Sequence, residues 1–148
     1  MKTIFLSVFI LINSIFQQTT SRADLCGLLQ KKIEAKSQHN KPDKINCDKY
    51  GNIVFYFDNP DSPNQKGVFN LFETHTKIEQ IEWVNGQKPY KLTIYCKTNC
   101  ISLLNWWKND KNIYSDNWEF EFLNKEDANY VAKCLANLKL KCIRDPNK

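Results

Sequence analysis

The sequence predicts a small α+β domain in which a bent antiparallel sheet of about six strands lies between an N-terminal helix and a closing C-terminal helix. Two observations support this class. Apolar residues recur at helical spacing over 24–36 and again near the end of the chain, over 124–141. Between them, residues 52–122 carry β-branched and aromatic runs divided by turn residues, and such a run of strands without intervening helices favours antiparallel pairing.

Residues 1–23 have the three parts of a secretory signal peptide. Lys2 supplies the positive start, a 13-residue largely apolar run follows, and Ser21 and Ala23 are the small residues expected before a cut after Ala23. The run is shorter than the ~20 residues that a membrane-spanning helix needs. We therefore expect 24–148 to be a single disulfide-stabilised domain, secreted or periplasmic, with no transmembrane segment after signal removal.

The charge balance of the expected mature domain is mild. Without Lys2 and Arg22, the 21 basic residues fall to 19 against 16 acidic ones, a formal charge of +3. The lysines of residues 31–49 lack the interleaved aromatic side chains and the arginines that nucleic-acid binding favours. We expect no specific nucleic-acid partner.

All six cysteines follow the predicted cleavage site, and an even number in an exported chain of this size predicts three disulfides. Cys96 and Cys100 flank the short stretch KTN and are the favoured local pair, because a hairpin loop can bring them together. Cys26 and Cys47 flank a loop and are the second candidate pair.

Cys134 and Cys142 are more constrained. In one continuous helix they would lie ~12 Å apart, whereas a disulfide needs Cα atoms within ~7 Å, so this pair requires the helix to end before Cys142. A zinc site at Cys96 and Cys100 would need a second ligand pair, which the sequence does not offer. We expect no metal and no cofactor.

The N-terminal part of the expected domain combines a helix and a loop. Residues 24–36 predict a short amphipathic helix, with lysines opposite an apolar stripe. The stripe consists of Leu25, Leu28, Leu29 and Ile33. Residues 37–52 are polar, contain Pro42 and Gly51, and predict a loop.

The middle of the chain predicts six strands, at 52–57, 68–73, 77–84, 90–96, 100–107 and 118–122. Residues 58–67 predict a turn region, and 108–112 a charged loop. Asn85-Gly86 is a strong hairpin signal. In the third strand the apolar alternation slips between Ile78 and Ile81, which predicts a bulge.

The last strand and the closing helix are the clearest part of the sequence. Trp118, Phe120 and Phe122 alternate with glutamates, the pattern of a half-buried strand. Asn124 can then cap a helix, with Asp127 accepting in return, and the helix is expected to end near residue 141. Its apolar stripe consists of Ala128, Val131, Ala132, Leu135 and Leu138.

Residues 52–141 resemble a pleckstrin-homology-like domain. The likeness rests on consecutive hairpins, the final strand WEFEF and the helix KEDANYVAKCLANL that follows at once. In that family the closing helix plugs one end of a bent sheet. The loop 58–67 lacks the basic signature of phosphoinositide-binding members, and Tyr130 is the nearest aromatic to the family's helical tryptophan. The resemblance therefore implies a fold and no function.

The stretch NWWKND suggests a binding surface. Adjacent residues of a strand point to opposite faces, so Trp106 and Trp107 cannot both enter the core. The outer one, beside Lys108, is the candidate binding residue, since tryptophan is enriched at interface hot spots. We expect an exported binding module that engages a protein partner, of the inhibitor, immunity or envelope-associated type.

The alternative is a secreted ribonuclease-like hydrolase in which His39 and His75 exchange protons. Both histidines lie in polar stretches typical of exposed turns. Glu119 and Glu121 could form a carboxylate pair, but one strand's solvent face is expected to be polar. We favour a protein without enzymatic activity.

Overall fold

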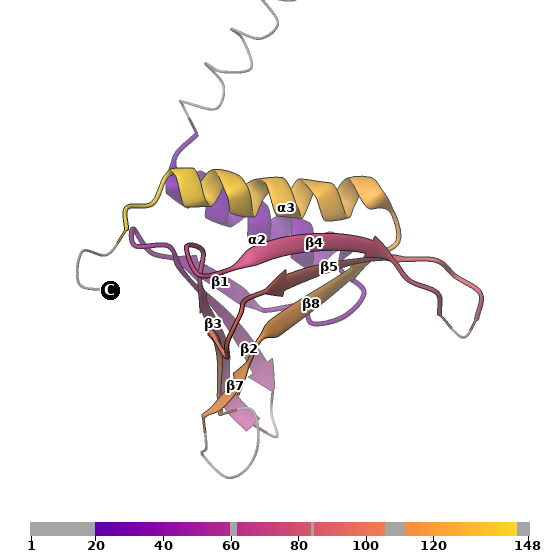
Figure 1. The fold of residues 1–148 in the computed structure, drawn as a ribbon, viewed down its shortest axis with the longest axis horizontal. Coiled ribbons are helices and arrows are strands. Elements are labelled where there is room, and N and C mark those ends of the chain that lie inside the picture. The colour runs from indigo at the N-terminus through magenta and orange to yellow at the C-terminus, as the bar shows by residue number, and fades with distance from the viewer. Residues whose placement is uncertain (1–19, 60–61, 84, 106–111, 145–148) are drawn as a thin grey trace, which may run out of the picture.

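The structure is a computed structural model, and it describes residues 20–59, 62–83, 85–105 and 112–144. Its helices are α2 (Arg22–Lys36) and α3 (Lys125–Leu140). The strands are β1 (Lys44–Cys47), β2 (Asn52–Asn59), β3 (Ser62–Asn70), β4 (His75–Gln80), β5 (Tyr90–Tyr95), β6 (Ile101–Leu104), β7 (Ile113–Ser115) and β8 (Asn117–Phe122). The α+β class is as predicted (Figure 1).

The strands form two antiparallel sheets, where the sequence predicted one bent sheet of about six strands. The larger has the order β1-β2-β3-β6-β7, and the smaller has the order β4-β5-β8. The division arises because β3 pairs with β6 and not with β4, which follows it in the chain. The turn predicted at 58–67 is also wrong, because β2 and β3 remain paired through Phe57 and Gln65 as far as Asn59 and Ser62.

The strands that the sequence did not predict are short edge strands. β1 lies in the expected loop 37–52 and pairs with β2, and β7 has three residues and pairs with β6. Only Ile45 of β1 is buried, and no residue of β7 is buried. Neither strand therefore has the alternation of buried apolar residues that would have predicted it. The bulge predicted between Ile78 and Ile81 is absent, because the β4–β5 register runs evenly from His75 to Gln80.

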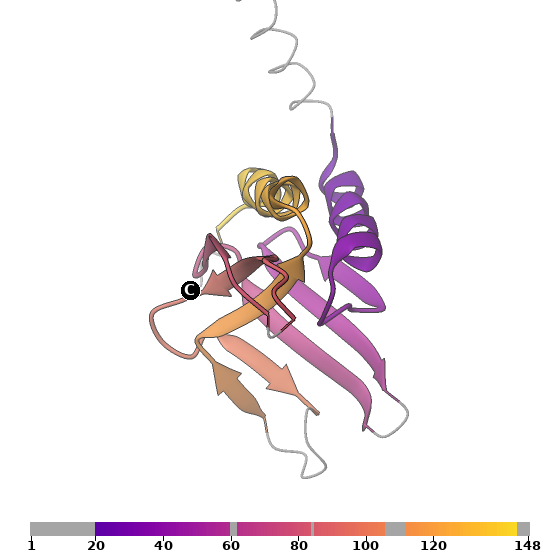
Figure 2. The same cartoon turned by 90° about the vertical axis from the view of Figure 1, so that its right-hand side faces the viewer.

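Aromatic side chains of both sheets form the centre of the core. Phe55 of β2 lies with ring centroids 5.4 Å from Phe69, 5.4 Å from Phe120 and 5.9 Å from Trp118. The two helices lie side by side along one side of the sheets (Figure 2). The buried stripe of α3 consists of Ala128, Val131, Cys134, Leu135 and Leu138.

Both helices begin with a side-chain cap. Asn124 accepts from the N–H of Asp127 at 2.9 Å, and α3 ends at Leu140 as expected. Asp127 accepts in return from the side-chain amide of Asn124, not from its backbone. α2 begins at Arg22 and is capped by Ser21, which the predicted cut after Ala23 would remove. No helix within the described residues is long and apolar enough to span a bilayer.

Two of the three expected disulfides are confirmed in the structure, Cys26–Cys47 and Cys96–Cys100. The third is wrong: Cys134 and Cys142 are both unpaired in the described structure. Cys134 is buried inside α3, whereas Cys142 follows the end of that helix and its thiol donates to the carbonyl of Asp48. The residues between the two cysteines are nearly all helical, so the rise of the helix keeps the two sulfur atoms too far apart to form a disulfide.

One edge of the three-stranded sheet is covered by the segment that follows α2. In residues 37–40, the Gln38 N–H donates to the Glu121 carbonyl at 2.7 Å, and the Asn40 side-chain amide donates to the Glu119 carbonyl at 2.9 Å. Asn40 adopts a φ of 57°, a left-handed conformation that asparagine tolerates. These bonds occupy the outer edge of β8.

The opposite edge, formed by β4, has no such cover within the described part of the chain. The Ile81 N–H donates to the Pro89 carbonyl, continuing the β4–β5 register. Because backbone groups alternate in direction along an antiparallel strand, those of Thr76, Ile78 and Gln80 point away from β5. β4 therefore presents a row of outward N–H and C=O groups.

Candidate functional site

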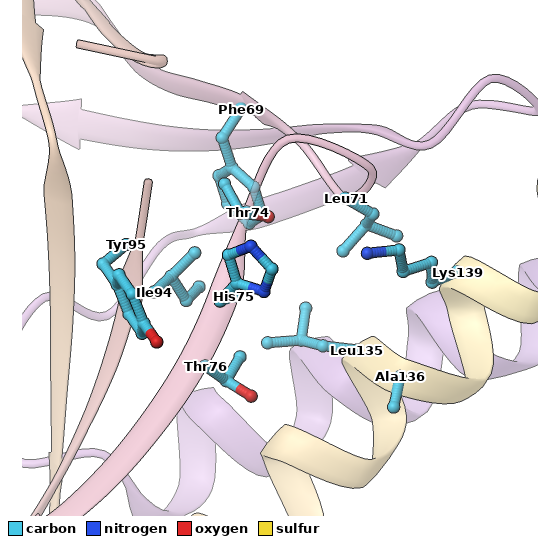
Figure 3. A pocket seen from close by; sticks show the side chains of 10 residues that line it. All are labelled: Phe69, Leu71, Thr74, His75, Thr76, Ile94, Tyr95, Leu135, Ala136 and Lys139. Carbon is cyan, nitrogen blue, oxygen red and sulfur yellow. The ribbon is translucent and has the colours of Figure 1, made fainter. Parts of the chain in front are cut away.

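A pocket of about 330 Å³ lies where the start of β4 faces the second half of α3 (Figure 3). Its floor consists of four buried apolar side chains, Phe69, Leu71, Ile94 and Leu135. Buried Thr74 also lines it, and its mouth is lined by His75, Thr76, Tyr95, Ala136 and Lys139. An apolar floor with a few polar groups around the mouth is the usual composition of a binding pocket.

The local fold places these groups. Thr74 ends the β3–β4 turn, where its hydroxyl donates to the Asn70 carbonyl at 3.0 Å. His75 opens β4, opposite Tyr95 of β5, with the two ring centroids 5.7 Å apart. Figure 3 shows His75 and Lys139 on opposite sides of the pocket, one from β4 and one from α3. The pocket thus depends on the register of β4 against β5 and on the seating of α3.

The charge beside the pocket is positive. The Lys139 ammonium lies 5.8 Å from the Phe72 ring centroid, and the Arg144 guanidinium lies 5.6 Å from the same centroid. Within the described residues, neither cation forms an ion pair with a carboxylate. Both charges remain available to an anionic group of a ligand.

A second hollow of about 500 Å³ adjoins the first, and His75 lines both. Its other walls are Glu73 and the loop that the Cys96–Cys100 disulfide closes. The disulfide constrains this wall, since the three-residue loop that it closes cannot extend. His75 therefore stands between an apolar pocket and a polar hollow.

The structure does not bring His39 and His75 together. His39 lies at the covered edge, with its Nε2 3.6 Å from a carboxylate oxygen of Glu121. Through the β8–β5–β4 register, Glu121 is level with Glu79, four residues beyond His75 on β4. Four strand residues span ~13 Å. Two histidines this far apart cannot act on the same phosphodiester, so the geometry does not support the hydrolase alternative.

The two glutamates considered as a carboxylate pair are engaged elsewhere. Glu119 forms an ion pair with Lys91 at 3.2 Å, and Glu121 accepts from the Trp83 indole N–H at 3.1 Å. They lie on the outer face of the sheet, as a polar solvent face requires. Among the described residues, no group of three or more His, Cys, Asp or Glu side chains could hold a metal ion.

The predicted binding residues Trp106, Trp107 and Lys108 lie outside the described residues. The pocket beside β4 was missed by sequence reasoning. Its one cationic wall residue, Lys139, looks in the sequence like an ordinary lysine of a helix C-terminus, and its floor residues look like any core. A pocket arises from how elements meet, and no spacing in the sequence signals it.

No family model, curated protein or solved structure matches the chain.

Proposed function

We propose that this chain is an exported, disulfide-stabilised binding protein that engages a protein partner through the pocket between β4 and α3. The observation that carries the proposal is the pocket itself, which combines a buried apolar floor with two nearby cations that form no ion pair with any described carboxylate. An apolar side chain of a partner would fill the floor, and the partner would be of the inhibitor, immunity or envelope-associated type.

Several features are consistent with this role. The two disulfides suit a small domain that works in an oxidising compartment. The proposal includes a secretory signal peptide at residues 1–23, a pleckstrin-homology-like fold for residues 52–141, and a contribution of Trp106 or Trp107 to binding. His39 and His75, the pair that the hydrolase alternative needs, lie at different edges of the sheet.

The test compares the wild-type chain with Ala136→Phe, which places a phenyl group at the pocket mouth from an exposed helical position. The matched control is Ala35→Phe, the same change at an exposed position of α2. Each protein is immobilised and exposed to the host's secreted and envelope proteins. We expect proteins retained by the wild type and by Ala35→Phe to be lost from Ala136→Phe. Equal retention by all three would contradict the proposal.

A further inference from the structure

We propose that the partner contributes an extended, acidic segment that pairs with the open edge of β4 and inserts one apolar side chain into the pocket. The proposal rests on the proposed function, because it specifies how that same pocket is used. The added segment becomes a fourth strand of the sheet β4-β5-β8.

The backbone geometry of β4 supports strand addition. The outward N–H and C=O groups of Thr76, Ile78 and Gln80 have no strand beside them within the described residues. An unpaired edge is a template for another chain unless it is blocked by proline, bulges, charged side chains or cover. β4 contains no proline, its register has no bulge, and the charges of its Lys77 and Glu79 are paired with each other. On the opposite edge, the 37–40 segment supplies the cover that β4 lacks.

The side-chain geometry links the edge to the pocket. Thr76 is opposite Ile94 and Ile78 is opposite Leu92, so both β4 residues belong to the face that carries the buried side chains of β5. Cross-strand neighbours share a face. A residue of the added strand beside Thr76, facing the same way, therefore points into the space between β4 and α3, where the pocket lies.

The positive charges beside the pocket indicate that the partner segment is acidic. Lys139 lines the pocket, and Arg144 lies over the same Phe72 ring as Lys139, with no carboxylate paired to either within the described residues. Carboxylates of the partner segment, next to its apolar residue, would pair with them. A second copy of this chain fits less well, since β4 offers only one carboxylate, Glu79, and it is already paired with Lys77 and Lys91.

The probe is a library of random nine-residue linear peptides displayed on phage. It is selected on the full oxidised chain and counter-selected on Ala136→Phe, and the most enriched peptide is then synthesised. We expect a consensus with one apolar residue flanked by Asp or Glu. A library that yields no peptide preferring the wild type, or a consensus without acidic residues, would overturn the proposal.

Strand pairing is tested by Gln80→Pro, which removes one outward N–H outside the pocket and leaves the bonds to β5 in place. Gln80→Ala is the control, because it removes the same side chain and keeps the N–H. We expect Gln80→Pro to weaken peptide binding about tenfold and Gln80→Ala to leave it unchanged. N-methylation of successive peptide amides provides a second test that leaves the protein intact, with losses at alternate positions only.

The charge pairing is tested by Lys139→Glu against Lys133→Glu, an identical change at an exposed site of the same helix outside the pocket. We expect at least a tenfold loss of peptide affinity for Lys139→Glu and none for Lys133→Glu.

The tests also separate the two proposals. If Ala136→Phe abolishes binding while Gln80→Pro and amide methylation have no effect, the pocket is the binding site and strand addition is wrong. If none of these changes matters, both proposals fail. A stable dimer that excludes the peptide would identify a second copy as the occupant and overturn the proposal.

Discussion

The two edges of the three-stranded sheet, formed by β8 and β4, differ in whether another described segment of the chain covers them. The β8 edge is covered by residues 37–40, whose backbone and side chains bond to its carbonyls. Within the part of the chain that the structure describes, no strand pairs with the β4 edge, which lies beside an apolar pocket whose nearby cations, Lys139 and Arg144, form no ion pair there. An exposed edge is a liability that proteins usually block. This difference is the reason that we propose β4, and not β8, as the edge that a partner joins.

We expect the Cys26–Cys47 disulfide to contribute most to the stability of the covered β8 edge. It ties α2, and hence residues 37–40 that follow this helix, to β1. Replacing both cysteines by serine releases a loop with a sequence separation of 21, and we expect a loss of about 3 kcal/mol in unfolding free energy. Urea denaturation measures this change. The matched control replaces Cys96 and Cys100, which close a shorter loop, and should lose about 2 kcal/mol. Equal or reversed losses would contradict the loop argument.

The next largest effect is expected at the contact between the two helices. The Lys32 ammonium pairs with Asp127, which also takes part in the cap of α3. We expect Asp127→Asn to lower the free energy of unfolding by about 2 kcal/mol at pH 7, because a hydrogen-bonded charge pair is lost. Chemical denaturation measures the change, with Glu126→Gln, an exposed neighbour, as the control.

This contact also predicts a pH dependence. Partial burial opposes ionisation of Asp127, but hydrogen bonds from Lys32 and Asn124 outweigh it and hold the pKa of this carboxyl below its usual value. A carboxyl with a lowered folded-state pKa stabilises the protein above the unfolded pKa of ~3.9, and the gain is lost as the pH falls through the folded value. The difference between wild type and Asp127→Asn should shrink below about pH 4. A difference that stays constant down to pH 2 would contradict this assignment.

A smaller effect is expected from the cover of β8 itself. Asn40→Gly keeps the left-handed backbone accessible and removes only the side-chain bond to Glu119. We expect a loss of about 1 kcal/mol, with peptide binding at β4 unchanged. Asn40→Ala should lose more, because alanine is strained at this φ. If Asn40→Gly weakened peptide binding, the two edges would not be independent.

The smallest effects concern the two histidines, one at each edge. We expect His75→Ala to weaken peptide binding about threefold and His39→Ala to have no effect, because only His75 lines the pocket. Neither the wild type nor either variant should cleave RNA. Cleavage by the wild type that disappears in both variants would restore the hydrolase alternative.

The sequence predicted the features that local patterns encode. The caps, the two helices, the alternating β8 and the hairpin at Gly86 are all set by residues close together in the chain, and Gly86 indeed adopts a φ of 79°. The division into two sheets was not predictable, because it depends on β3 choosing β6 over β4. The absence of a bond between Cys134 and Cys142 was not predictable either, because α3 ends at Leu140, before Cys142, and the outcome depends on the path of the chain after that end. The pocket was missed for the same reason, since its walls come from three distant segments.

Amide hydrogen exchange of the full oxidised chain, with and without the selected peptide, tests the central claim most directly. In the free protein the outward amides of Thr76, Ile78 and Gln80 should exchange rapidly, since no strand protects them. With peptide bound, we predict slow exchange at these three positions, with no change in the 37–40 segment that covers β8. Continued rapid exchange at all three under saturating peptide would contradict the account.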